Sequence, residues 1–389
     1  MNQTPRARHW RLLALLAAIL VFAVACGDSD EDSTDTTAAA ADTDDSDDTG
    51  DSGCDHEPIV AAFVYIGPVG DAGWTKKHDD GRLSLEEALG DCVETQYLEN
   101  IPEGADSVAT FDRLAREGTD VIFGTSFGYM EPMLEVAANY PDVKFEHATG
   151  YKQADNMSNY FGAAEEARYL SGMAAGSMTE SNTIGYVAAF PIPEVLRGIN
   201  AFALGAQRVN PDVVVEVVWT STWFDPVVEK EAAESLLNGG ADVIAQHQDT
   251  PSAGEAAENA GGYWVGYNDD MSRFAPDAWL TAPVWDWGPY YVAVVESIAD
   301  GSWSSQSYYG TMADGLVTLA DVSDKVSQDV RDDIANVQGE IIAGSFTPFD
   351  GPVNDQDGNA KVAEGEKPDL GTLLGMDYLV EGVIGNAAG

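Results

Sequence analysis

Short, almost wholly apolar runs alternate along this chain with stretches in which apolar residues recur at helical spacing. The first such run, from Ile59 to Tyr65, is rich in β-branched and aromatic residues and is closed by Gly67 and Pro68. A run of this kind is typical of a strand buried on both faces of a parallel sheet. We therefore predict that it is the first strand of an α/β domain.

Helical and strand-like segments then alternate as far as residue 178. The apolar pattern predicts helices that end near Leu89, span about Asp106 to Glu117 and span Met130 to Asn139, with strands CVETQYL, DVIFGTS and VKFEHA between and after them. Such alternation gives a doubly wound parallel sheet covered on both faces. We expect NMSNYFG and a long helix over Ala163 to Met178 to close this first lobe.

The same alternation of strand and helix patterns begins again at TIGYVAAF and predicts a second lobe of the same kind. Its strands are VVVEVVW, ADVIAQH and GYWVGY, with helices between them. About 330 folded residues accommodate two such lobes. The segments LTAPVWDWGPYYVAVVESIADG and YYGTMADGLVTLA are predicted to cross between the lobes, which makes a hinge with a cleft. We expect residues 58–178 and 286–304 in the first lobe, and 179–285 and 305–389 in the second.

The first 26 residues have the pattern of an export signal. A basic start and an apolar core from Leu12 to Val24 precede small residues and Cys26. We predict a signal peptide over residues 1–25 and lipidation of Cys26, although Ala23 stands where lipoprotein signals usually carry Leu. Ordinary secretion is the alternative. Acyl chains would anchor the protein to a membrane without spanning it.

Residues 26–57 are mostly acidic or small and lack the apolar residues needed to form a core, so we predict a flexible tether. Acidity extends through the whole chain, with 66 Asp and Glu against 19 Lys and Arg and a formal charge of −47. This charge argues against nucleic acid or an anionic membrane face as a partner.

Two cysteines remain once Cys26 is assigned to lipid. Cys54 precedes the first predicted strand and Cys92 begins the second. If those strands are neighbours, the two cysteines lie close together, and an exported protein permits a disulfide between them. No Cys or His spacing in the sequence suggests a metal site.

The candidate binding residues follow the predicted strands, because ligands gather beyond the carboxyl ends of parallel strands. Aromatic residues are unusually frequent in these loops: Trp74, Phe127, Phe190, Trp223, Phe224, Trp285 and Trp287. Flat side chains facing a cleft suit a flat ligand, and each stacked base is worth about 1–3 kcal/mol. The alternative for any single aromatic is burial in a lobe core. Four polar residues are predicted to bind the ligand's edge: Asp71, Ser126, Asn268 and Asp269.

Catalytic motifs are missing from the sequence. It holds no G-x-S-x-G elbow, no P-loop and no convincing Ser/His/Asp order. The adjacent acids Asp269–Asp270 and Glu165–Glu166 favour hydrogen-bonding roles over acid/base catalysis. We therefore expect a binding protein with no catalytic residues and no cofactor.

Several longer segments together resemble a known family. They include GPVGDAGW, FEHATGYK, WTSTWFDPVVEKEAA, ADVIAQHQDTP, VGYNDDM and LTAPVWDWGPYY, and the likeness runs from Ile59 to beyond Asp350. This set resembles the basic membrane protein family of substrate-binding lipoproteins of ABC transporters. The resemblance implies a type I periplasmic-binding-protein fold, a purine nucleoside or nucleobase as ligand, and permease and ATPase subunits as partners. We expect a monomer, lipid-anchored on the extracytoplasmic face of the cell membrane.

The resemblance also assigns roles to individual residues. Trp74 and Trp223 match the family's base-stacking aromatics, and Asp71 matches its first-loop Asp. Nucleoside-binding relatives carry an Asp near Asn268 and a Lys near Trp285, both used on the ribose. Because an amide and a bulky indole stand there in this chain, we hypothesise a free nucleobase such as adenine.

Two other readings are open. A sugar receptor on the same fold would also use aromatic faces, but it predicts more charged residues in the cleft than Arg197 and Arg273. An exported nucleoside hydrolase would need several Asp at the end of the first strand to hold calcium, whereas this strand ends in Gly67 and Pro68.

Overall fold

The computed structural model describes residues 53–388, in which two six-stranded sheets form the centres of two lobes. The first sheet has the order β12-β5-β4-β3-β1-β2, and all its neighbouring strands are parallel. Its strands are β1 (Ile59–Val64), β2 (Val93–Leu98), β3 (Val121–Gly124), β4 (Lys144–Ala148), β5 (Met157–Gly162) and β12 (Ser307–Gly310). The predicted α/β fold with parallel sheets is confirmed.

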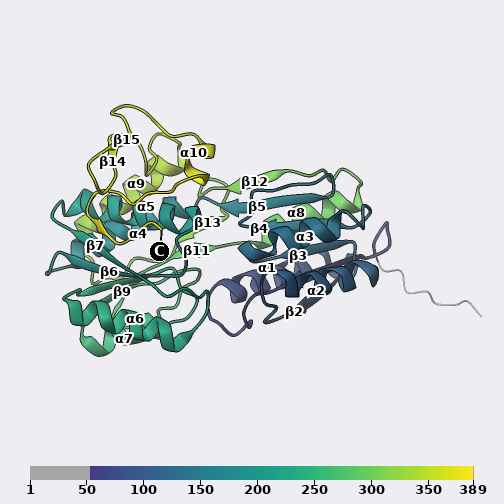
Figure 1. Cartoon of the computed structure of the whole chain (residues 1–389), viewed down its shortest axis with the longest axis horizontal. Coiled ribbons are helices and arrows are strands. Elements are labelled where there is room, and N and C mark those ends of the chain that lie inside the picture. Colours follow the sequence, from purple (N-terminus) through teal and green to yellow (C-terminus); the bar gives the residue numbers. More distant parts are fainter. Residues whose placement is uncertain (1–52, 389) are drawn as a thin grey trace, which may run out of the picture. The chain divides into compact units, whose positions relative to one another are not determined.

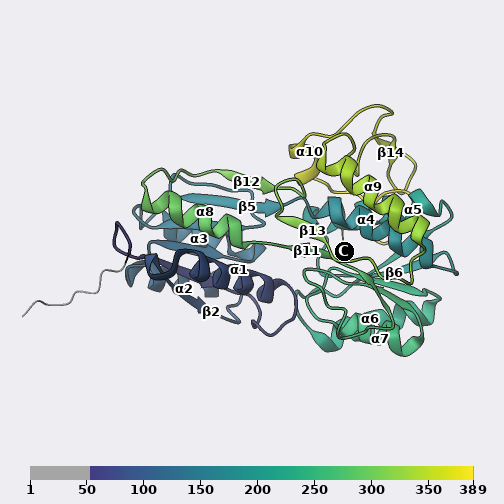
Figure 2. The same ribbon diagram turned by 180° about the vertical axis from the view of Figure 1, so that it is seen from behind.

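Helices cover both faces of this sheet, because successive side chains of a strand point to opposite faces. Phe63 of β1 belongs to the same buried cluster as α1 (Trp74–Leu89) and α8 (Gly288–Ala299). Its neighbour Val64 belongs to another cluster, with α2 (Ala105–Arg116) and α3 (Met130–Ala137). Helices α2 and α3 are seen in Figure 1, and α1 and α8 are clearer from behind in Figure 2.

The second sheet repeats this design with the order β10-β9-β8-β6-β7-β16, again with parallel neighbours. Helices α4 (Ala164–Met178) and α5 (Pro193–Val209) share a buried cluster with one face, and α6 (Pro226–Gly239) and α7 (Ser252–Ala260) share one with the other. The strands are β6 (Thr183–Ala188), β7 (Val214–Trp219), β8 (Val243–Gln246), β9 (Tyr263–Val265), β10 (Trp279–Thr281) and β16 (Val383–Ile384).

Helix α4 packs on the second lobe, although the sequence predicts that it closes the first. Glycines of both helices let α4 lie directly against the backbone of α5. A Cβ added to Gly172 would come within 2.0 Å of the carbonyl oxygen of Phe202, and one added to Gly205 would come within 1.9 Å of that of Tyr169. Apolar spacing identifies a buried helix, but it does not say which sheet the helix covers.

The chain crosses between the lobes after β5, between β11 (Pro283–Trp285) and α8, and between β12 and β13 (Val317–Leu319). Strands β11 and β13 pair as an antiparallel ribbon. Strand β12 joins the first sheet, so this lobe extends past residue 304, where the sequence placed its end. The crossings bring the ends of both sheets to one cleft.

The rest of the chain packs on the second lobe. Helix α9 (Gln328–Ile342) lies on α4, and α10 (Leu370–Leu374) lies on α5. A short hairpin of β14 (Val353–Asn354) and β15 (Ala360–Val362) lies between them in sequence. Two 3-10 turns, η1 (Gly90–Cys92) and η2 (Phe127–Tyr129), complete the elements of the described residues.

The predicted disulfide is confirmed. Cys54 and Cys92 are bonded, with 5.5 Å between their Cα atoms, and they precede the adjacent strands β1 and β2. The predicted signal peptide, Cys26 and nearly all of the acidic tether lie outside the described residues. Among residues 53–388, no helix has both the length and the apolar character needed to cross a membrane.

Candidate ligand-binding site

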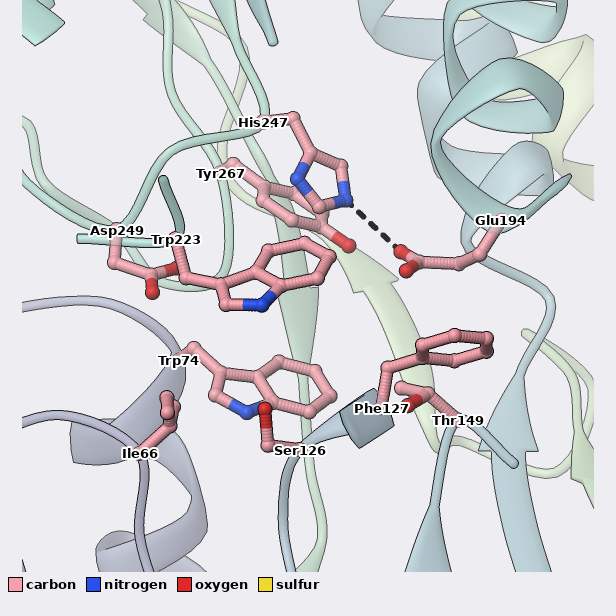
Figure 3. Close-up of a pocket in the computed structure, with 10 residues that line it drawn as sticks. All are labelled: Ile66, Trp74, Ser126, Phe127, Thr149, Glu194, Trp223, His247, Asp249 and Tyr267. Carbon is pink, nitrogen blue, oxygen red and sulfur yellow. Dashed lines mark hydrogen bonds and ion pairs between the residues drawn. The ribbon is translucent and has the colours of Figure 1, made fainter. Parts of the chain in front are cut away.

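A narrow cavity between the two lobes, which we call the slot, lies beyond the carboxyl ends of the strands. Its volume is about 30 Å³, counted as space open to the centre of a water molecule. The first lobe supplies Ile66, Trp74, Ser126, Phe127 and Thr149, and the second supplies Glu194, Trp223, His247, Asp249 and Tyr267 (Figure 3).

Trp74 forms part of the first-lobe wall and is held on several sides. Its indole Nε1 donates a hydrogen bond of 2.7 Å to the carbonyl oxygen of Thr125. The ring meets His78 edge-on at 4.2 Å, Trp287 at 5.7 Å and Trp285 at 6.1 Å between centroids. Only 9% of Trp74 is exposed, so its orientation is fixed by packing and by a hydrogen bond within its own lobe.

Trp223 lies on the opposite wall, in the loop after β7, and is half-buried. Figure 3 shows its indole facing that of Trp74 across the slot. Its Nε1 donates to Glu103 of the first lobe at 3.2 Å, and Phe190 packs on it edge-on at 4.8 Å. Glu103 also accepts hydrogen bonds from Ser126 Oγ and Gly128 N–H. Glu103 therefore joins the two walls.

Asp71 lies at the start of α1, where its carboxylate accepts hydrogen bonds from the backbone N–H groups of Gly73, Thr75 and Lys76. Free N–H groups at a helix start favour a negative charge. Burial nevertheless outweighs these bonds and raises the pKa of Asp71. The structure thus gives Asp71 a role in the first turn of the helix that carries Trp74.

Asp249 brings a second buried carboxyl group to the slot. Burial, followed by the nearby charges of Asp71 and Glu229, raises its pKa well above the ordinary value. Asn268 Nδ2 donates to Asp249 Oδ1 at 3.0 Å. A carboxyl group that retains its proton can both donate and accept hydrogen bonds. Gly73 lies directly against Asp249, because a Cβ there would come within 2.4 Å of the Asp249 carbonyl oxygen.

Glu194 and His247 form a polar pair on the second-lobe wall, with 2.9 Å between the carboxylate oxygen and Nε2. Burial alone would raise the pKa of Glu194, but His247, Arg197 and Arg168 outweigh burial and lower it. The Arg168 guanidinium also lies 3.6 Å from the ring centroid of Tyr267. The second-lobe wall is therefore packed against both acidic and basic side chains.

Four of the nine predicted ligand-binding residues line the slot: Trp74, Ser126, Phe127 and Trp223. Three more lie next to residues that line the slot. Asp71 accepts hydrogen bonds at the start of the helix that carries Trp74, Asn268 donates to Asp249, and Phe190 packs on Trp223. Asp269 pairs instead with Lys76 at 3.1 Å and Lys77 at 3.7 Å, across the two lobes.

Trp285 lies behind the slot and does not line it. Only 1% of Trp285 is exposed, and its ring stacks on Trp287 with 4.9 Å between centroids. Its Nε1 donates to Asn268 Oδ1 at 2.9 Å. Trp285 and Asn268 thus form a bonded pair behind Trp74 and Asp249.

The nine predicted binding residues leave out six that line the slot: Ile66, Thr149, Glu194, His247, Asp249 and Tyr267. His247 and Asp249 follow directly after β8, and the sequence already places residues 246–249 at the cleft, without assigning either side chain to the ligand. Thr149 carries no such signal, because its place depends on a left-handed backbone conformation with φ of +66°.

No metal centre competes with the slot within residues 53–388. That part of the chain holds no group of three or more His, Cys, Asp or Glu residues able to bind a metal. Of the adjacent acids considered for catalysis, Glu165 pairs with Arg197 at 3.2 Å and accepts a hydrogen bond from Tyr309. Glu166 accepts from the backbone N–H of Met312.

Two doubly wound lobes joined by several crossings, with a slot between them, define a type I periplasmic-binding protein. The model of the family described as "ABC transporter substrate-binding protein PnrA-like" matches residues 59–347. The chain belongs to this family of substrate-binding proteins of ABC transporters, which are binding proteins and not enzymes. The family predicted from the sequence motifs is thereby confirmed.

Similar proteins support this assignment. A purine-binding protein of Brucella abortus is 48% identical over 84% of this chain and 93% of its own length. A putative ABC transporter glucose-binding protein of Haloferax volcanii is 44% identical over 85% of this chain and 81% of its own. A solved solute-binding protein of Aeropyrum pernix shares the fold, with a TM-score of 0.66 and 19% identity over 75% of this chain and 93% of its own.

Proposed function

We propose that this protein binds a purine nucleobase in the slot and delivers it to the permease of an ABC importer. The observation that carries the proposal is the pair of indoles, Trp74 and Trp223, that face each other from different lobes (Figure 3). A flat heterocycle between them would stack on both, and each stacked face contributes about 1–3 kcal/mol. The relative from Brucella abortus, named as purine-binding, supports a purine as the heterocycle.

The slot as it stands is narrow, with only about 30 Å³ open to the centre of a water molecule. The walls must therefore separate for the ligand to enter. The bond between Trp223 and Glu103, at 3.2 Å, already joins the lobes, so the structure corresponds to a nearly closed form. Ligand would enter an open form and stabilise the closed one by its greater affinity for it.

Polar groups at the rim of the slot suit the edge of a purine, which carries both hydrogen-bond donors and acceptors. The Asp249 carboxyl group and the Glu194 carboxylate both bring oxygen atoms to the slot. Both belong to the second lobe, whereas Ser126 Oγ approaches from the first. A ring held by all three would draw the lobes together.

A free base such as adenine is favoured over a nucleoside by the residues behind the slot. Trp285 and Asn268 are hydrogen-bonded to each other and almost wholly buried. Neither side chain can swing aside for a sugar without leaving a buried polar group unpaired, which costs about 1–3 kcal/mol. A ribose directed toward these residues would therefore meet a filled wall.

The partners follow from the family. A substrate-binding protein presents its closed, ligand-bound form to a membrane permease driven by an ATPase. We propose that lipid on Cys26 holds the protein at the extracytoplasmic face of the membrane, with the acidic residues that follow as a tether. Mass spectrometry of the mature protein from its membrane fraction tests this, because an acylated N-terminal Cys26 is expected and an unmodified chain would contradict it.

A thermal-shift screen tests the ligand. The purified mature protein is heated with adenine, guanine, hypoxanthine or xanthine, with the corresponding nucleosides, and with glucose. A ligand that binds only the folded state raises the melting temperature. We expect shifts with bases and none with nucleosides. Shifts with nucleosides alone would overturn the role given to Trp285 and Asn268, and a shift with glucose alone would overturn the purine assignment.

A further inference from the structure

A second cavity, which we call the chamber, adjoins the slot on one side. Its volume is about 390 Å³, counted in the same way as that of the slot. Three residues line both cavities: Phe127, Thr149 and Glu194. Figure 3 shows these three side chains together at one side of the slot. A ligand in the slot therefore has free space beyond these residues, whereas Trp285 and Asn268 fill the region behind Trp74.

Thr149 at this junction has two unusual properties. Its backbone has φ of +66°, a left-handed conformation that is a genuine outlier for a β-branched residue. Its hydroxyl is buried and has no hydrogen-bond partner among the described residues. Strained backbone and unpaired buried polar groups persist where a function uses them. Thr149 thus lines both cavities and carries a hydroxyl that no described residue satisfies.

The charged groups of the chamber already have partners. The Arg197 guanidinium pairs with Glu165 at 3.2 Å and donates to the carbonyl oxygen of Leu373. Glu194 pairs with His247. Much of the remaining wall consists of aromatic and aliphatic side chains: Phe127, Tyr151, Phe161, Ile192, Tyr308 and Leu374. Such a surface favours an apolar group, with one hydrogen bond available at its entrance.

We propose that the chamber binds an apolar substituent on the exocyclic amine of the purine, so that N-alkylated or N-arylated adenines are ligands. The ring lies in the slot, the linking N–H donates to the Thr149 hydroxyl, and the substituent packs among the aromatic side chains. This inference rests on the proposed function, because it needs the ring in the slot. Once the walls have separated to admit a ring, the bare base needs only the slot and not the chamber, so adenine binds as well.

Calorimetric titration of the mature protein with adenine and with N6-benzyladenine tests the proposal. Two variants of the exposed helix α10 form a matched pair. Leu374→Trp, at a residue 37% exposed, fills part of the chamber, and Leu370→Trp, at a residue 42% exposed, lies on the same helix outside both cavities. Burying a phenyl ring is worth about 1.5–3 kcal/mol, so Leu374→Trp should weaken N6-benzyladenine binding about tenfold or more.

The same change should leave adenine affinity unaltered, and Leu370→Trp should change neither affinity. Thr149→Val keeps the β-branched shape but removes the hydroxyl, and it should weaken N6-benzyladenine more than adenine. Adenine binding without any N6-benzyladenine binding would overturn the chamber proposal and leave the proposed function intact. An unchanged N6-benzyladenine affinity in Leu374→Trp would also overturn the chamber proposal. Failure of both ligands to bind would overturn the proposed function itself.

Discussion

The two walls of the slot are built in different ways. On the first lobe, Trp74 is fixed by packing against three aromatic rings and by a bond to its own lobe. On the second lobe, Trp223 is half-buried, and its Nε1 bonds across the cleft to Glu103. The first wall belongs to the folded core of its lobe, whereas the position of the Trp223 indole depends on closure.

Ionisable side chains follow the same division. The slot residues of the first lobe carry none, whereas those of the second include Glu194, His247 and Asp249. A rigid apolar surface can receive a flat ring before closure, and the polar groups then approach with the moving lobe. We therefore expect the first wall to bind the flat face of any suitable ring, and the polar groups of the second wall to decide which ring is bound.

Trp74→Ala should have the largest effect because it removes a residue of both the slot and the core. Replacing a buried Trp by Ala costs about 3–5 kcal/mol of stability, and the stacked face is lost as well. Chemical denaturation should show the loss of stability, and titration with adenine should show the loss of affinity. A variant of unchanged stability would show that the Trp74 indole is not part of the core in solution.

Trp223→Ala should weaken binding but leave stability nearly unchanged, in contrast to Trp74→Ala. The expected loss in binding is about 1–3 kcal/mol, the value of one stacked face. Calorimetric titration with adenine measures it. Trp219→Ala is the matched control, because Trp219 ends β7 outside the slot. Equal losses in the two variants would rule out a stacking role for Trp223.

Glu103→Ala should have a smaller effect, because it removes the bond between the walls while leaving both indoles. One hydrogen bond contributes about 0.5–1.5 kcal/mol, so adenine should bind about 2- to 13-fold more weakly. The loss should appear mainly as faster ligand release in stopped-flow fluorescence, because the closed form is destabilised. Unchanged release would show that Glu103 does not help to hold the lobes closed.

Glu194→Gln should have the smallest effect at neutral pH, since a Gln oxygen can still accept from His247. Burial would raise the pKa of Glu194, but His247 and two arginines hold it below 4.5. An acid whose pKa is lowered by folding stabilises the folded state above its unfolded pKa, and this contribution is lost as the pH falls through the folded pKa. The free energy of unfolding of the variant should therefore lie below that of the parent at neutral pH, and the difference should shrink as the pH falls below the ordinary pKa of a glutamate. A difference that grows on acidification would contradict the lowered pKa.

The sequence predicts most of the fold, because alternating apolar runs and amphipathic stretches directly specify buried parallel strands and covering helices. The apolar pattern could not predict which lobe α4 packs on. Its buried face is evident, but its attachment to the second lobe depends on the close contact of Gly172 with the backbone at Phe202. Such a contact between segments 30 residues apart has no local signature.

The aromatic part of the site was predictable, because Trp74, Phe127 and Trp223 follow strand ends where turn residues would otherwise be expected. The polar part was predictable only in part: Ser126 lines the slot as expected, but the acidic residues could not be assigned. Asp269 and Asp249 both follow strands of the second sheet, yet Asp269 pairs with lysines whereas Asp249 lines the slot. Which acid reaches the cleft depends on backbone direction after each strand, and residue type does not determine that direction.

The bond between Cys54 and Cys92 has a mechanical consequence. It joins the chain just before β1 to the chain just before β2, two neighbouring strands. A pull on the residues that precede Cys54 is therefore shared by both strands and cannot peel β1 alone from the sheet. If lipid on Cys26 fixes this protein to a membrane, a drag on the lobes is divided between the backbone that leads into β1 and the disulfide that leads to β2. Reduction of the disulfide would place the whole load on β1.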